Sequence, residues 1–159
     1  MVDATGGYIV NDKATFPSEL TLKGVRVVVD AAHGAAYKVA PAVFAELGAD
    51  VTALGVSPNG RTIHTAGGVL HPEGVAREIA KRKAHIGIAL DGDADRLIVI
   101  DERRVIVDGD AVMALCATRL MRQGRLAKNT VVATVMSNMG LELALTAAGG
   151  ALVRTAVGD

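Results

Sequence analysis

Short apolar runs rich in β-branched residues alternate along this chain with segments of helical periodicity. In order, the runs and helical segments are 25–30, 34–48, 49–56, 72–84 and 85–91. Parallel strands that are buried on both faces give such runs, and helices connect them across the sheet. Two further runs, 96–101 and 104–107, flank a short turn and indicate a hairpin. We therefore predict an α/β fold of three layers, helices–sheet–helices (α/β/α). Its mixed, mostly parallel sheet would have four strands, one of them an antiparallel edge strand.

A second cycle of the same kind follows a strong helical segment at 108–124. It consists of a run at 130–137, a helical segment at 138–150 and a run at 151–159. About 30 residues make only one minimal strand–helix–strand unit, so we expect this second α/β unit to be incomplete. The predicted domains are a peripheral N-terminal linker at 1–23, an α/β domain at 24–127, and the truncated start of another domain at 128–159.

Three aspartates, Asp91, Asp93 and Asp95, occupy alternate positions directly after an apolar run, and Arg96 follows them. Like charges this close repel unless they are well solvated or share a cation. Ligands of open parallel sheets bind beyond the carboxyl ends of the strands, where this loop would lie. Carboxylate oxygens favour Mg²⁺ or Ca²⁺, with Mn²⁺ also compatible, and Arg96 is suited to a phosphate. The pattern predicts a metal site that serves phosphate chemistry.

Two other interpretations explain part of the aspartate pattern. One is a polar turn between two strands, which explains a single aspartate better than three. The other is the calcium loop of an EF-hand, which fits acidic residues at positions 1, 3, 5 and 12 when counted from Asp91 to Glu102. Arg96 stands at position 6, where that loop needs glycine, and the flanking runs predict strands rather than helices. The sequence therefore favours the metal site for phosphate chemistry.

Several other polar residues have structural explanations beside functional ones. Asp30 and His33 follow the first predicted strand, so they either shape a turn, the favoured interpretation, or lie near a bound anion. Asp108 and Asp110 are expected to cap a helix start. Cys116, the single cysteine, lies in an apolar helical pattern and is expected to fill the core.

Charge and composition narrow the partners and the compartment. Lys and Arg together number 17, as do Asp and Glu, and no basic block occurs, which argues against a nucleic-acid or membrane-surface partner. The start MVDATGGYIV is typical of neither a signal peptide nor a membrane span. This start, together with a single cysteine that cannot form an internal disulfide, indicates a cytoplasmic protein. In residues 128–159 we expect apolar side chains without their usual cover, and hence a homo-oligomer through this segment. Those side chains are Val131, Val132, Val135, Leu141, Leu143 and Leu145.

Several stretches of the chain resemble the α-D-phosphohexomutase superfamily. They are ALDGDADRLIVID, VDGDAVMAL and TVMSNMGLELAL…VGD, with YIVNDKATFP, VVVDAAHGAAYKVAP and GVSPNG upstream in the same order. Together they resemble the second domain and the opening of the third, and MSNMGLELAL points to the glucosamine branch. Ala94 stands where this superfamily usually has glycine, and the stretch RTIHTAGGVLHPEG departs from its usual loop.

The resemblance implies an isomerase that interconverts sugar 6-phosphates and 1-phosphates, here those of glucosamine, for peptidoglycan precursors. A phosphoserine donates the phosphoryl group to a phosphosugar substrate. Asp91, Asp93 and Asp95 would bind the Mg²⁺ cofactor, and Arg96, as a catalytic residue, would hold the transferring phosphate or its serine loop.

A phosphoserine loop like T-A-S-H-N-P does not occur in the chain, whose serines are Ser18, Ser57 and Ser137. We therefore expect a fragment that is inactive alone. The alternatives are a fragment of a phosphomannomutase or phosphoglucomutase, or a non-catalytic assembly module.

Overall fold

The structure is a computed structural model that describes residues 4–61 and 67–158. The chain forms two compact units, Met1–Ile106 and Val107–Asp159, and each is described by itself. None of the helices in the described part of the chain is both long and apolar enough to cross a membrane.

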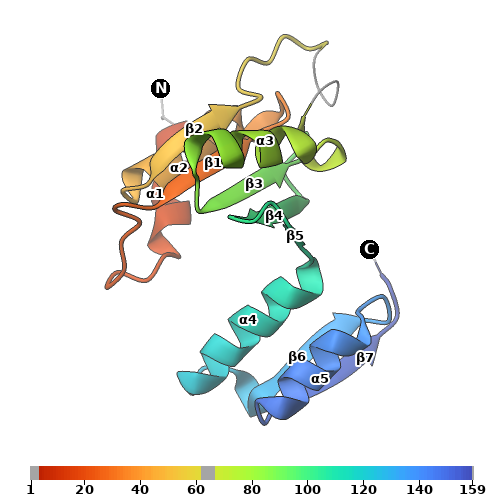
Figure 1. The fold of residues 1–159 in the computed structure, drawn as a ribbon. Helices are drawn as coiled ribbons and strands as arrows, with labels where there is room; N and C mark the ends of the chain where they lie inside the picture. Colours follow the sequence, from red (N-terminus) through yellow and green to blue (C-terminus); the bar gives the residue numbers. More distant parts are fainter. Residues whose placement is uncertain (1–3, 62–66, 159) are drawn as a thin grey trace. The chain divides into compact units, whose positions relative to one another are not determined.

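The first unit is built on a mostly parallel sheet (Figure 1). The strand order is β2 (Asp50–Leu54), β1 (Arg26–Asp30), β3 (Ile86–Leu90), β4 (Leu97–Asp101) and β5 (Ile106–Val107). β1 runs parallel to β2 and β3, whereas β4 is antiparallel to β3. The predicted mixed sheet is confirmed, but it has five strands rather than four because the two residues of β5 also pair at the edge.

Helices cover both faces of this sheet, as the three-layer prediction requires. On one face, Val28 of β1 and Ala89 of β3 pack against Val75 and Ile79 of α3 (Glu73–Arg82). The alternate residues of β3 face the side that holds η1 (Ala35–Tyr37) and α2 (Val39–Glu46). The period-2 alternation of the strands therefore places one apolar set under each helical layer.

The N-terminal segment contains a helix that the sequence pattern did not reveal. Residues 4–14 form α1 (Ala4–Ala14), which packs on α2 and pairs Lys13 with Glu46. None of its residues is buried, and it contains Gly6 and Gly7, so it has neither an apolar period nor high helix propensity. Contact with α2 therefore stabilises this helix more than its own sequence does.

The second unit has its own small core. It contains α4 (Gly109–Arg122), η3 (Ala127–Asn129), β6 (Thr130–Thr134), α5 (Met139–Ala147) and β7 (Ala151–Thr155), with β6 parallel to β7. Ala117 of α4 packs with Ala133, Leu141 and Leu145. Because α4 contributes to this core, the units divide at Ile106 and Val107, whereas the sequence assigned that helix to the domain at 24–127.

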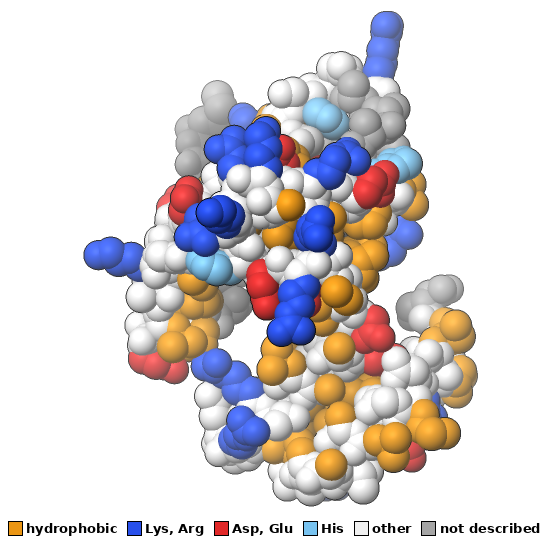
Figure 2. Space-filling model, in the orientation of Figure 1, with side chains coloured by type: hydrophobic (Ala, Val, Ile, Leu, Met, Phe, Trp, Pro, Cys, Tyr) orange, Lys and Arg blue, Asp and Glu red, His pale blue; other side chains and the backbone are white. Residues whose placement is uncertain are grey.

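Two expectations about side-chain exposure in this unit need correction. Leu141 and Leu145 are 2% and 0% exposed, because α4 and the two strands cover them, so they are not free for association. Val131 is half-buried beside them, whereas Val132, Val135 and Leu143 are exposed, in line with the expectation. Cys116 is exposed rather than in the core, since the packed stripe of α4 runs through Met113, Ala114, Ala117 and Met121. Figure 2 shows hydrophobic side chains at the surface of this unit.

Candidate metal centre

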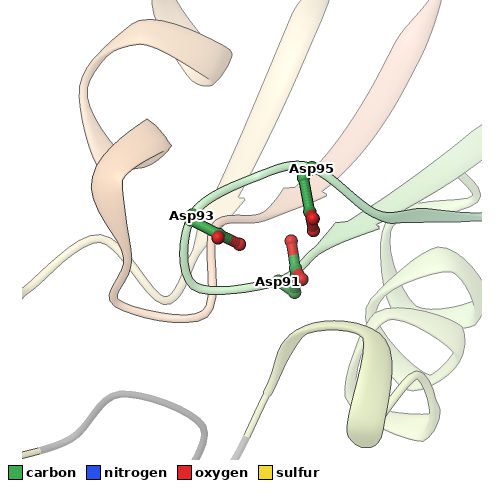
Figure 3. A group of neighbouring side chains, drawn as sticks. All are labelled: Asp91, Asp93 and Asp95. Atoms are coloured by element: carbon green, nitrogen blue, oxygen red, sulfur yellow. The ribbon is translucent and has the colours of Figure 1, made fainter. Parts of the chain in front are cut away.

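The loop between β3 and β4 brings the three predicted aspartates together (Figure 3). Asp91 directly follows β3 and is 1% exposed, whereas Asp93 and Asp95 are exposed. One carboxylate oxygen from each of the three lies within 4.8 Å of the others. The alternate spacing thus turns all three carboxylates toward one point.

Arg96 closes this loop onto Asp91. The backbone N–H of Arg96 donates to Oδ1 of Asp91 at 3.1 Å, and its Nε donates to Oδ2 at 2.8 Å. The backbone N–H of Asp91 donates in turn to the carbonyl oxygen of Arg96 at 3.3 Å. Nε also lies 3.5 Å from Oδ1 of Asp95. Arg96 therefore offsets part of the repulsion among the carboxylates, although its side chain remains largely exposed.

These contacts drive the pKa values of the carboxyl groups apart. Burial raises the pKa of Asp91, but the hydrogen bonds from the backbone and side chain of Arg96 outweigh it and lower this pKa to about 2. A hydrogen bond with Asp91, then burial, then the charges of Asp91 and Asp93 raise the pKa of Asp95. The Asp91 carboxylate raises the pKa of Arg96. Asp91 is thus held ionised, whereas its neighbour Asp95 loses its proton less readily than an ordinary aspartate.

The backbone of the loop turns sharply at Ala94. Ala94 has φ 64°, in the left-handed region, and its N–H donates to the carbonyl oxygen of Asp91 at 3.2 Å. Strands β3 and β4 flank this turn, as the pattern predicted. Because an EF-hand loop needs helices on both sides, the structure excludes that interpretation.

Asp30 and His33 lie at the carboxyl end of β1 and take part in a turn. The carboxylate of Asp30 accepts the N–H groups of Ala32 and Gly68, and Nδ1 of His33 accepts the N–H of Ser57 at 3.2 Å. These bonds support the turn-shaping interpretation.

The other polar residues, Asp108, Asp110, His71 and His85, lie at a helix start or make contacts away from the metal loop. Asp108 caps α4 by accepting the N–H of Ala111 at 2.7 Å, as expected, and Asp110 accepts the N–H of Asn138. His71 contacts Glu73, Nδ1 of His85 accepts the N–H of Arg26 in β1, and His64 lies outside the described residues.

A mostly apolar cleft of about 610 Å³ adjoins the loop. Asp93 and Ala94 line it together with Tyr8 of α1, Phe44 of α2 and Leu97 of β4. Sequence reasoning missed this cleft because one of its walls is α1, the helix without a sequence signal.

The donor set fits a small, hard divalent cation. Carboxylate oxygens are the ligands that Mg²⁺ and Mn²⁺ prefer. Three carboxylates whose oxygens lie within 4.8 Å of one another repel until a cation neutralises them. A guanidinium beside such a centre is suited to a phosphate oxygen. The arrangement can therefore bind a metal ion and hold a phosphate beside it.

The first unit is a layered α/β/α domain with an acidic loop at the carboxyl edge of its sheet, the edge at which open α/β sheets bind their ligands. Two family models match the chain: phosphoglucomutase/phosphomannomutase, alpha/beta/alpha domain II, over residues 7–109, and domain III of the same family over residues 108–159. The chain belongs to this family, as the resemblance indicated. The junction of the two matches falls close to the division between the two units.

Curated relatives and solved structures agree with this assignment. A phosphoglucosamine mutase of Sorangium cellulosum is 66% identical over 99% of this chain and 33% of its own length. Another, of an Anaeromyxobacter species, is 62% identical over 99% of this chain and 34% of its length. The crystal structure of a phosphoglucomutase/phosphomannomutase family protein from Burkholderia thailandensis superposes with a TM-score of 0.81 at 26% identity, over 98% of this chain and 34% of that one. The chain spans about a third of the length of the curated relatives it matches.

Proposed function

We propose that this chain is the metal-binding part of a phosphoglucosamine mutase, an isomerase that converts glucosamine 6-phosphate to glucosamine 1-phosphate through a phosphoserine. The observation that carries the proposal is the convergence of three carboxylates within 4.8 Å, in a chain 66% identical to a protein of that name. The high identity favours glucosamine over the mannose or glucose phosphates of other members of the family. A cytoplasmic role in supplying cell-wall precursors follows from this substrate.

The proposed roles use the contacts of the loop. Asp91, Asp93 and Asp95 would hold Mg²⁺, which supplies charge neutralisation at the transferring phosphoryl group. Arg96 keeps Asp91 ionised and in place through Nε. Since its contacts with Asp91 and Asp95 both use Nε, we expect its two terminal nitrogens to meet the phosphate.

Metal binding by the chain itself tests this proposal. We expect Mn²⁺, followed by water-proton relaxation or electron paramagnetic resonance, to bind the wild type and to be displaced by Mg²⁺. Asp93→Ala should abolish Mn²⁺ binding, because it removes one of the three ligands and leaves the pairing of the buried Asp91 with Arg96 intact. Asp50→Ala is the matched control, since Asp50 is an exposed carboxylate at the amino end of β2. Equal binding by the wild type and Asp93→Ala would remove the metal role of the loop.

Self-association through residues 128–159 is a second candidate. Val132 and Val153 are directly opposed in the β6–β7 pairing and are 63% and 49% exposed, on the sheet face opposite Ala133 and Leu152. Burying such a pair against a second copy of the chain would remove apolar surface from water. We expect Val132→Thr to lower the dimer fraction in light scattering, with the buried Ala133 left unchanged. A strictly monomeric wild type at all concentrations would exclude this candidate.

A further inference from the structure

Asp30 is a buried carboxylate outside the metal loop that anchors two backbone segments. It is 3% exposed and ends β1. The N–H of Ala32 donates to its Oδ1 at 2.9 Å, and the N–H of Gly68 donates to its Oδ2 at 3.0 Å. Gly55 and Gly67 crowd it so closely that an added Cβ atom would lie 2.4 Å and 2.6 Å from its carboxylate oxygens. The chain is thus folded tightly around this one group.

The first anchored segment reaches the middle of the metal loop. After the turn at Ala32 and His33, both in the left-handed region, the N–H of Ala35 donates to the carbonyl oxygen of Gly92 at 2.8 Å. A Cβ atom added to Gly34 would lie only 2.2 Å from that same oxygen. Gly34 has φ −96°, a conformation open to any residue, so close approach to Gly92 is the reason for glycine here.

The second anchored segment reaches the base of the same loop. A Cβ atom added to Gly68 would lie 2.4 Å from the carbonyl oxygen of Leu90. Leu90 and Gly92 are the two neighbours of Asp91 in the chain. Both segments held by Asp30 therefore pack closely against the backbone on either side of Asp91, the most buried of the three carboxylates.

We propose that Asp30, with residues 32–35 and 67–68, forms a brace that positions the metal loop, and that Asp30 and Gly34 are positioning residues for cation binding. The proposal rests on the metal function proposed above. Three carboxylates that repel one another keep converging oxygens only if their backbone is held from outside. Groups that orient metal ligands typically contribute about 10- to 100-fold to metal affinity.

Gly34→Ala tests the brace without changing any charge. Its methyl group must displace Gly92 or the turn, and we expect Mn²⁺ affinity to fall about tenfold or more. Gly7→Ala is the matched control, because an added Cβ atom there meets nothing within 4 Å. Asp30→Asn is the second variant. It leaves an amide N–H₂ facing one of the two backbone donors, and we expect it to weaken Mn²⁺ binding similarly.

Two readouts separate positioning from general damage. Circular dichroism and thermal melts identify the temperatures at which each variant is folded, and Mn²⁺ affinity is compared only there. Amide ¹H–¹⁵N signals of residues 91–96, recorded without metal, should move in Gly34→Ala and stay in place in Gly7→Ala. A folded Gly34→Ala with wild-type Mn²⁺ affinity and unmoved loop signals would overturn the proposal.

The same design distinguishes failure of the brace from failure of the metal function. If the wild type binds no Mn²⁺, the proposed function of the loop fails, and the metal-free amide signals still decide whether Gly34 sets its conformation. If Gly34→Ala does not fold, Asp30→Asn decides by the same two readouts. Loop signals and Mn²⁺ affinity that are unchanged in a folded Asp30→Asn count against the brace.

Discussion

Asp91 and Asp95 carry the same carboxyl group, yet their surroundings move their pKa values in opposite directions. The folded chain lowers the pKa of Asp91 from its ordinary 3.8 to about 2, so the stability from its pairing with Arg96 is present above pH 3.8 and is lost as the pH falls toward 2. In a ¹³C carboxyl titration of the metal-free chain, we expect a pKa of about 2 for Asp91 and a pKa above the ordinary value for Asp95. The reverse order would contradict the pairing of Arg96 with Asp91.

Asp95 gives a prediction about stability with the opposite sign. A raised pKa in the folded state means that the ionised Asp95 destabilises the fold at neutral pH, and that protonation relieves this as the pH falls through the raised value. Asp95→Asn should therefore raise the melting temperature at pH 7 in EDTA. The same variant should reduce or abolish the stabilisation that the wild type gains from added Mn²⁺. Asp50→Asn should do neither, and a lower melting temperature of Asp95→Asn in EDTA would refute the account.

Ala94 is held in a conformation that favours glycine. Its φ of 64° is in the left-handed region, which costs an L-residue about 1–2 kcal/mol. Glycine adds back about 0.4–1 kcal/mol of unfolded-state entropy. Ala94→Gly should therefore stabilise the chain by about 0.5–1 kcal/mol in urea unfolding. Ala80→Gly, at an exposed position inside α3, should instead destabilise it by about 1 kcal/mol.

Helix α3 lies close to β3 because Gly87 has no side chain. A Cβ atom added there would lie 2.3 Å from Cγ1 of Val75 and 2.7 Å from Cδ1 of Ile79, both almost fully buried. Gly87→Ala should force the helix away from the sheet and destabilise the first unit by about 1–3 kcal/mol. Thermal unfolding monitored by circular dichroism would measure this, with Gly109→Ala as the control where an added Cβ atom meets nothing. No loss of stability in Gly87→Ala would show that α3 is loosely packed.

The elements that the sequence predicted are those whose own pattern matches their surroundings. The β-branched run at 25–30 became β1, and the amphipathic segment at 72–84 became α3, since each buries its apolar residues. Helix α1 could not be predicted, because packing on α2 rather than any period of its own stabilises it. The boundary of the units was missed for a related reason. The pattern of α4 shows that it has an apolar stripe, but not which core that stripe joins.

In the candidate site, too, contacts within one loop could be predicted from the sequence, whereas contacts between distant segments could not. Alternate spacing was enough to place Asp91, Asp93 and Asp95 around one point, because three ligands within five residues share one loop. Arg96 was expected to hold a phosphate, and its pairing with Asp91 became visible only in the structure. The approach of Gly34 to Gly92 joins segments 58 residues apart, and no spacing in the sequence reports it.

In the molecule as a whole, the residues proposed for the chemistry all lie in the first of the two units. The first unit contains the carboxylates and Arg96, and the second has its own core from α4, α5 and the β6–β7 pair. Phosphoryl transfer through an enzyme-bound phosphate needs a nucleophile near the metal, a bound sugar and a cation. Charge neutralisation by the loop can lower the barrier of that transfer, but it cannot substitute for the group that carries the phosphoryl.

A polypeptide of these 159 residues should therefore bind a divalent cation and yet show no conversion of glucosamine 6-phosphate to glucosamine 1-phosphate. Its serines, Ser18, Ser57 and Ser137, lie in no stretch that resembles the phosphoserine loop of the superfamily. The assay would contain Mg²⁺ and a bisphosphorylated sugar, with the full-length relative of 66% identity as the positive control. Turnover that disappears in Asp93→Ala would reveal a nucleophile within these residues and overturn the assignment of this chain to the metal-binding part alone. Turnover that persists in that variant would indicate a contaminating mutase, which substitution of each serine by alanine would check.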